Sequence, residues 1–176
     1  MKRILIIGCP GSGKSTFARV LRELTGLPLY YLDMLYHKPD KTIYPLSEFD
    51  RQLKDILLQD AWIIDGNYTR TLPLRLEYCD TVFWLDYPLE VALSGIAARM
   101  GQPREDMPWI ETEPDPEFLN YIKNFNQTQK PEIKGILRKS QEKNIIIFRT
   151  REESETFLEK LRAERISYHF SSPCIL

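Results

Sequence analysis

The chain has 176 residues, of which 43% are hydrophobic and 28% charged, which suits one domain over residues 1–176 and excludes a mainly disordered chain. Lysine and arginine number 24 against 25 acidic residues, so the formal net charge is −1. Because proteins that bind nucleic acid usually carry excess positive charge to neutralise phosphates, this balance argues against direct DNA binding.

The start of the chain predicts a strand, a helix and a second strand. Arg3–Ile7 is an apolar, largely β-branched run, as a buried central strand requires. Residues 14–25 place their apolar side chains on one helical face, and Gly26-Leu27-Pro28 ends this helix. Leu29–Leu32 is predicted as the second strand, which ends at Asp33.

The middle of the chain continues this alternation. A helix is predicted from an N-cap at Ser47 through Leu58, and Ala61–Ile64 and Thr81–Leu85 are predicted as buried strands. Pro88 suits the first turn of a helix that runs to about Arg99.

Residues 100–117 interrupt the pattern with several prolines and acidic residues, and we expect a lid there rather than a linker. Phe118–Lys143 has helical spacing with a bend near Pro131, Asn144–Phe148 is a fifth strand, and Glu152–Arg162 is a last helix before a tail. The alternation predicts an α/β fold of three layers, with a five-stranded parallel sheet and a small lid segment.

Residues 8–16 satisfy the phosphate-loop pattern G-x-x-x-x-G-K-[ST], between a predicted strand and an amphipathic helix. The glycines let successive backbone N–H groups wrap a phosphate, and the helix adds its N-terminal partial charge. Lys14 is expected to reach the β- and γ-phosphates, and Ser15 to supply an oxygen to Mg²⁺. The predicted nucleotide-binding residues are Gly8, Cys9, Pro10, Gly11, Ser12, Gly13, Lys14, Ser15 and Thr16.

Three aspartates follow predicted strands. Because ligands collect at the carboxyl ends of parallel strands, Asp33, Asp65 and Asp86 are expected to face the phosphate loop. Asp65 is the candidate that holds Mg²⁺ with Ser15, and Asp86 is a rival for this role. Each aspartate alternatively caps the helix that follows it.

The chain resembles the adenylate-kinase-like nucleoside monophosphate kinases in the order and spacing of four elements: the phosphate loop, Asp33-Met34-Leu35, Asp65-Gly66 and Asp86-x-Pro88-x-Glu90. It is also similar to the bacterial DNA topology modulation proteins (FlaR-related) up to about residue 163. That similarity is carried by Leu32-Asp33, by the run from Trp62 to Tyr68, and by Arg104-Glu105-Asp106-Met107.

The resemblance implies binding of ATP and Mg²⁺ on Gly8–Thr16 and transfer of a phosphoryl group to a small-molecule acceptor, nucleoside-like or nucleotide-like. The acceptor would be held by residues after the second and third strands: Asp33, Asp65, Asn67, Tyr68 and Arg70. The family label leaves an alternative open, namely a regulatory nucleotide-binding protein or an ATPase associated with DNA topology.

Three departures from the adenylate-kinase pattern concern positive charge. Tyr36 stands where those kinases have an arginine after Asp-Met-Leu, and Arg70 is displaced by one position. Gly95 stands in place of the first of two lid arginines, which leaves Arg99 as the second. Because bidentate arginines grip phosphates, these losses argue against AMP as the acceptor.

Phosphoryl transfer needs positioning and positive charge on the group that moves, and Lys14, Arg99 and Arg104 are the first candidates to supply this charge. The alternatives are Lys130, Arg138, Arg149 and Arg151. A closing lid would bring Arg99 and Arg104 onto the γ-phosphate; alternatively they are ordinary solvated residues. Asp33 is a candidate base for the acceptor hydroxyl, or else a polar residue that caps a strand end.

The cysteines and apolar runs indicate a reduced cytoplasmic protein that makes no membrane contact. The sequence leaves both a monomer and a homodimer open. Cys9, Cys79 and Cys174 are odd in number and widely spaced, which argues against a disulfide framework. The run Ile4–Ile7 is too short for the core of a signal peptide, and no stretch approaches the roughly 18 apolar residues of a membrane span. Cys9 lies at a helix N-terminus, which can activate a thiol, but we expect it to fill space in the loop.

Overall fold

The computed structural model describes residues 1–140 and 142–171, so Cys174 lies outside the described residues. Five strands form one parallel sheet in the order β2-β3-β1-β4-β5, which confirms the predicted sheet. The strands are β1 (Arg3–Gly8), β2 (Leu29–Tyr31), β3 (Trp62–Asp65), β4 (Thr81–Leu85) and β5 (Asn144–Phe148).

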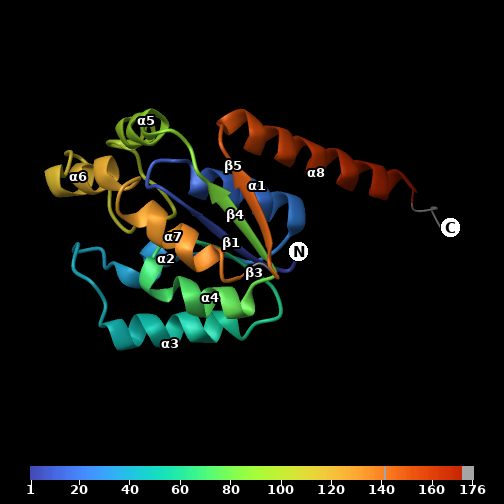
Figure 1. Ribbon diagram of the computed structural model, residues 1–176, viewed down its shortest axis with the longest axis horizontal. Coiled ribbons are helices and arrows are strands. Elements are labelled where there is room, and N and C mark those ends of the chain that lie inside the picture. Colours follow the sequence, from blue (N-terminus) through green and yellow to red (C-terminus); the bar gives the residue numbers. More distant parts are fainter. Residues whose placement is uncertain (141, 172–176) are drawn as a thin grey trace.

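Helices cover both faces of the sheet, with α1 and α8 on one side and α3, α4 and α7 on the other (Figure 1). The helices are α1 (Lys14–Thr25), α2 (Leu32–Tyr36), α3 (Leu46–Leu57), α4 (Leu72–Tyr78), α5 (Leu89–Arg99), α6 (Pro116–Asn124), α7 (Gln129–Leu137) and α8 (Arg151–Ser171), with a 3-10 turn η1 (Thr69–Thr71) before α4. Within the described ranges, none of these helices has the length and apolar character to span a membrane.

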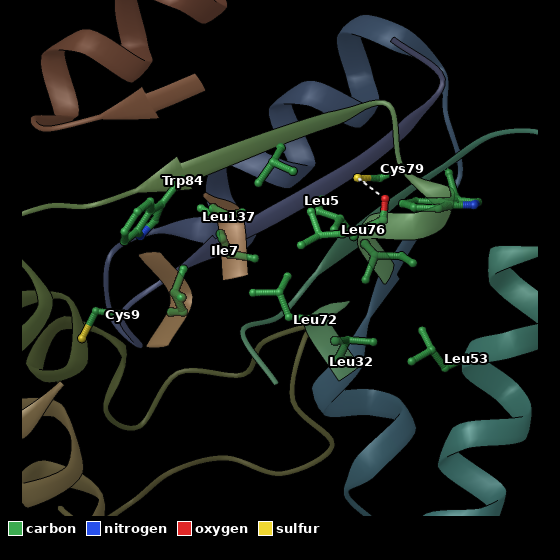
Figure 2. Packing of buried hydrophobic residues seen from close by; sticks show 14 of the residues in the cluster. Leu5, Ile7, Cys9, Leu32, Leu53, Leu72, Leu76, Cys79, Trp84 and Leu137 are labelled. Atoms are coloured by element: carbon green, nitrogen blue, oxygen red, sulfur yellow. Dashed lines mark hydrogen bonds between the residues drawn. The ribbon is translucent and has the colours of Figure 1, made fainter. Parts of the chain in front are cut away.

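The core has two halves that share β1. Ile4 and Ile6 point to the side of α1, where the Phe17 and Phe83 rings lie 5.2 Å apart between centroids. Their neighbours Leu5 and Ile7 point to the opposite side, where Figure 2 shows them among leucines of α3, α4 and α7. All four β1 side chains are fully buried, which explains why this strand is apolar on both faces.

The end of β2 differs from the prediction. The strand stops at Tyr31, and Leu32 and Asp33 begin the short helix α2. The His37 N–H donates to the Asp33 carbonyl at 2.9 Å and closes this turn, while Leu32 is fully buried under the sheet. Asp33 therefore projects from a helical turn.

The region predicted as one bent helix over Phe118–Lys143 is two helices. The chain breaks between α6 and α7, and Pro131 lies in the first turn of α7, where a missing N–H is tolerated. Asp115 caps α6 by accepting from the N–H groups of Glu117 and Phe118 at 2.9 and 3.2 Å.

Residues 100–115 are turns and irregular backbone between α5 and α6, and we call them the lid segment.

Three further helix boundaries differ from the prediction, and one helix was not predicted. The start of α3 follows Pro45, so Ser47 is not its N-cap, and Pro88 precedes α5 rather than lying in its first turn. The seven-residue helix α4 was not predicted. The helix α8 continues to Ser171, well past Arg162, so the expectation of a tail there is wrong for the described residues.

Candidate functional site

A cavity of about 770 Å³ opens where the strands end. Its wall is built by the loop after β1, the residues that follow β2 and β3, the helices α5, α6 and α7, and the lid segment. It brings together most of the predicted site residues: Lys14, Ser15, Thr16, Asp33, Asp65, Asn67, Tyr68, Arg70, Arg99 and Arg104. Figure 1 shows α5 and α6 beyond the ends of the strand arrows, and residues of both helices line the cavity.

The loop after β1 has the backbone of a phosphate cradle. Gly11 and Gly13 have φ angles of 82° and 90°, which side chains rarely allow. Lys14 begins α1, and its Nζ donates to the Cys9 carbonyl at 3.1 Å. In the described part of the chain, no side chain caps α1 and its first turn holds no acidic residue, so its N–H groups remain available to an anion.

Three predicted loop residues, Gly8, Cys9 and Ser12, do not line the cavity. Cys9 and Ser12 are buried, and burial raises the pKa of the Cys9 thiol to about 11, against the lowering effect of Lys14. Cys9 is therefore protonated at neutral pH, which agrees with the space-filling role expected for it.

The helix α5 lies directly on the phosphate loop through two glycines. A Cβ on Gly95 would be 2.0 Å from the Gly11 carbonyl oxygen, and a Cβ on Gly11 would be 2.1 Å from the Ala92 carbonyl oxygen. No side chain fits at either position. Gly95, which replaces a lid arginine in the resemblance, thus gives α5 close contact with the loop.

Two carboxyl groups meet at the Ser15 hydroxyl. Ser15 Oγ lies 2.6 Å from Asp65 Oδ2 and 2.9 Å from Asp106 Oδ2. Burial raises the pKa of Asp65 to about 6, although Lys14 and the hydrogen bond from Ser15 lower it. The structure therefore brings the predicted pair of Ser15 and Asp65 together and adds Asp106 from the lid segment.

The acceptor side of the cavity is built around Asp33. The Tyr68 hydroxyl donates to Asp33 Oδ1 at 2.7 Å, and burial, followed by the nearby Asp33 charge, raises the pKa of Tyr68. Asn67 lines the same wall, and its buried side-chain nitrogen and oxygen have no hydrogen-bond partner of normal geometry among the described residues. The Asn67 side chain also interacts with Tyr121 and acts to lower the pKa of that tyrosine, against the larger raising effect of burial. An amide whose hydrogen bonds are not all satisfied can bind a polar, uncharged ligand group.

Arg75 of α4 holds this wall in place, a role that the sequence analysis missed. Its side chain is fully buried, and it donates to the backbone carbonyls of Gly66, Asn67 and Tyr68 at 2.7 to 2.9 Å. Tyr68 has a φ of 22°, an unusual backbone conformation for a residue with a side chain. Arg75 thus stabilises the strained turn that presents Asn67 and Tyr68.

Arg70 is engaged by a partner within the protein. Its two Nη atoms lie 2.6 and 3.1 Å from the carboxylate oxygens of Asp50, a bidentate pair that is about half exposed. Because this geometry uses the face that would grip a phosphate, Arg70 lines the cavity with its charge largely neutralised.

Arg99 and Arg104 both line the cavity and are tied to the lid segment. Arg99 pairs with Glu111 at 2.7 Å, and Arg104 lies 3.7 Å from both Glu111 and Asp106. Burial, and then the neighbouring Arg104, lower the pKa of Arg99. Their side chains are about 15% exposed, so ordinary surface solvation does not describe them.

Asp86 lies in a different environment from Asp65. It pairs with Lys130 at 2.6 Å and with Arg149, and thereby joins β4 to α7 and to the end of β5. The expectation that it caps the following helix is wrong, since Pro88 is the N-cap of α5. Its charge is balanced within the protein, whereas Asp65 Oδ1 has no hydrogen-bond partner in the described ranges.

Comparisons with known proteins bear on the fold. No family model matches the sequence, and no curated protein gives a significant match to it. Among solved structures, shikimate kinase from Acinetobacter baumannii in complex with shikimate has a TM-score of 0.59 at 16% identity, over 93% of this chain and 94% of that one. Deoxyadenosine kinase from M. mycoides with bound dATP has a TM-score of 0.54 at 18% identity, over 92% and 100%.

A sugar kinase from Janibacter sp. also matches, with a TM-score of 0.53 at 17% identity over 93% of each chain. The chain has the fold of the P-loop kinases. Identities this low establish the fold alone, and the resemblance to the DNA topology modulation proteins stays a prediction.

Proposed function

We propose that this protein transfers the γ-phosphoryl group of ATP to a hydroxyl group of a small, uncharged acceptor. The observation that carries the proposal is that one cavity is lined both by phosphate-loop residues, Lys14 and Ser15 among them, and by the group formed by Asp33, Asn67 and Tyr68. The kinases of similar fold are named for small acceptors, namely shikimate, deoxyadenosine and a sugar.

The donor half of the cavity fits a nucleotide with its metal ion. Lys14 and the N-terminal N–H groups of α1 would bind the phosphates. Ser15 and Asp65 would hold Mg²⁺, because a hydroxyl oxygen and a buried carboxylate with a spare oxygen are the hard ligands that it prefers. Bound Mg²⁺ supplies charge neutralisation on the phosphates.

The acceptor half supplies a base and an orienting group. Asp33 would take the proton of the acceptor hydroxyl, while Tyr68 holds this carboxylate through its 2.7 Å hydrogen bond. The bond from the acceptor oxygen to the γ-phosphorus forms as the bond to the β,γ-bridging oxygen breaks, and ADP leaves. Arg99 and Arg104 would balance the charge on the moving group.

The charges around the acceptor half favour an uncharged acceptor. Arg70 is neutralised by Asp50, Tyr36 stands in place of a second arginine, and Glu132 adds negative charge to the wall. A phosphorylated acceptor would thus meet acidic groups here, and Arg70, the arginine that follows β3, is already engaged by Asp50.

Release of ADP, measured against a panel of nucleosides, sugars, other hydroxyl compounds and nucleoside monophosphates, tests the proposal. We expect an uncharged hydroxyl compound to stimulate release well above the rate with ATP alone, and to appear as its phosphate ester by mass spectrometry. Lys14→Ala is expected to abolish this release while the far-UV circular dichroism is unchanged. Release that no acceptor stimulates, or that survives Lys14→Ala, would contradict the proposal.

A further inference from the structure

Asp106 lies in the lid segment, yet its carboxylate reaches the first turn of α1. Asp106 Oδ2 is 2.9 Å from Ser15 Oγ, and Oδ1 is 3.8 Å from Arg19 Nη1. The residue is 6% exposed and lines the cavity beside Lys14 and Ser15. A negative group is therefore buried where the phosphates of a nucleotide would lie.

The protons available at Ser15 do not satisfy the oxygens that surround it. Ser15 Oγ has carboxylate oxygens at 2.6 and 2.9 Å, but a hydroxyl carries one proton and can donate to only one of them. Asp65 Oδ1 is buried as well, on a residue 5% exposed, with no hydrogen-bond partner in the described part of the chain. Buried carboxylate oxygens that lie close together without a proton between them repel each other, and a bound cation would relieve this repulsion.

The neighbouring arginines do not meet this need. Arg19 and Arg104 lie 3.8 and 3.7 Å from the Asp106 oxygens, which is ion-pair distance without a hydrogen bond. Arg19 lies near Oδ1, and Arg104 lies near Oδ2, the oxygen that also contacts Ser15, so both arginines moderate the charge of Asp106 without a hydrogen bond to it. The side that faces Ser15 and Asp65 remains a set of hard oxygen donors from two carboxylates and one hydroxyl.

We propose that Asp106 is a further ligand of the divalent cation, direct or through water, which joins the lid segment to the metal held by Ser15 and Asp65. The inference rests on the proposed function for the presence of a nucleotide and its metal. It follows that the interaction between Asp106 and the nucleotide depends on the cation. With the cation bound, Asp106 attracts the complex and holds the lid segment over it. Without the cation, the same carboxylate repels the phosphates.

The chain offers a matched control in the preceding residue. Glu105 also ties the lid segment to the region around α1, by an ion pair to Arg22 at 3.4 Å and by accepting from the Tyr31 hydroxyl. Its partners differ from those of Asp106, which is the member of this pair that contacts Ser15. Glu105→Gln therefore weakens the attachment of the lid segment without removing a metal-facing oxygen.

Calorimetric titration of the full chain with the non-hydrolysable β,γ-imido analogue of ATP tests the proposal, with excess Mg²⁺ and with EDTA. We expect Asp106→Asn to weaken binding of the magnesium complex by about ten- to a hundredfold, as is typical for removal of a group that supports a metal site. With EDTA, Asp106→Asn should bind the analogue as tightly as the wild type or more tightly. Glu105→Gln should lose less than about threefold in both conditions.

Hydrogen exchange gives a second readout that needs no acceptor. Residues 100–115 of the wild type should be protected by the analogue with Mg²⁺ but not with EDTA, and Asp106→Asn should lose this difference. The inference is overturned if Asp106→Asn weakens binding equally with Mg²⁺ and EDTA, or if Glu105→Gln reproduces its effect. Wild-type protein that binds no analogue in either condition would overturn the proposed function as well, whereas metal-dependent binding without any acceptor turnover would contradict only that function.

Discussion

Asp65 carries a free-energy cost at neutral pH. Burial raises its pKa from 3.8 to about 6, so the folded chain binds more protons than the unfolded chain between these values. The free energy of unfolding therefore falls as pH rises from about 4 to about 6, and above this window the charged Asp65 opposes folding. A carboxylate kept at such a cost is poised for a cation.

Asp65→Asn is expected to raise the free energy of unfolding near pH 7 by about 1–3 kcal/mol, because each pKa unit corresponds to about 1.4 kcal/mol and an amide has no charge to desolvate. Urea unfolding at pH values from about 4 to 7 measures this, and the variant should lack the decline that Asp65 causes. Equal stability of variant and wild type near pH 7 would contradict it.

Asp80 is the matched control for Asp65, because its pKa is lowered in the folded protein and not raised. Although burial acts to raise its pKa, hydrogen bonds from Thr81 and from the backbone N–H groups of Arg3 and Lys2 bring it below its ordinary value. A carboxyl group whose pKa is lower in the folded than in the unfolded chain stabilises the fold at pH values above its pKa in the unfolded chain. This stabilisation is lost as the pH falls through its pKa in the folded chain. Asp80→Asn should therefore lower stability near neutral pH.

Among the elements, α5 and the phosphate loop behave as one packed unit. The Gly11 and Gly95 backbones approach so closely that a Cβ on either would overlap a carbonyl oxygen. The phosphate cradle is thus supported from outside by a helix, and its shape depends on how closely that helix can approach. Both glycines are needed for close approach, and only Gly11 also needs a positive φ.

Gly95→Ala is expected to force α5 and the loop apart, since its methyl group would lie 2.0 Å from the Gly11 oxygen. We expect a loss of about 1–3 kcal/mol in stability from overpacking and a ten- to roughly hundredfold loss of affinity for the ATP analogue, because a displaced cradle no longer fits the phosphates. Thermal unfolding and calorimetric titration measure the two effects.

Gly135→Ala in α7 is the control, because a Cβ there meets nothing within 4 Å. Alanine favours a helix by about 1 kcal/mol over glycine, so this variant should gain stability and bind the analogue like the wild type. If Gly95→Ala also kept its stability and its affinity for the analogue, the close approach of α5 to the phosphate loop would not be needed for nucleotide binding.

The elements also show what sequence can and cannot predict. The five strands and the phosphate loop are local patterns, and each lies within one or two residues of its predicted place. The helix α4 is too short for a periodic signal, and Arg75 within it looks like any helical arginine until its burial is known. Asp106 appeared only within the run Arg104–Met107, because its meeting with Ser15 depends on how the lid segment crosses α1.

At the scale of the whole molecule, the net charge of −1 coexists with two hollows that are each lined by several lysine or arginine side chains. One is the cavity, whose wall includes Lys14, Arg19, Arg99, Arg104 and Arg151. The other is a shallow hollow beside α7, lined by Lys130, Lys134 and Arg138, where Lys130 is already paired with Asp86. The cavity suits a small polyanion such as a nucleotide. The hollow beside α7 leaves Lys134 and Arg138 to contact a larger polyanion such as DNA.

Lys134 and Arg138 of this hollow are too few, taken alone, to hold a DNA duplex at physiological salt, since each phosphate contact contributes one released counterion and specific binders usually make many. We expect the dissociation constant for a duplex of about 20 base pairs to be weaker than roughly 10⁻⁴ M under these conditions, measured by fluorescence anisotropy. At low salt, any binding should weaken further in the double variant with Lys134→Ala and Arg138→Ala. Binding tighter than about 1 μM at physiological salt would contradict this expectation and favour a role on DNA, because non-specific contacts do not reach that affinity.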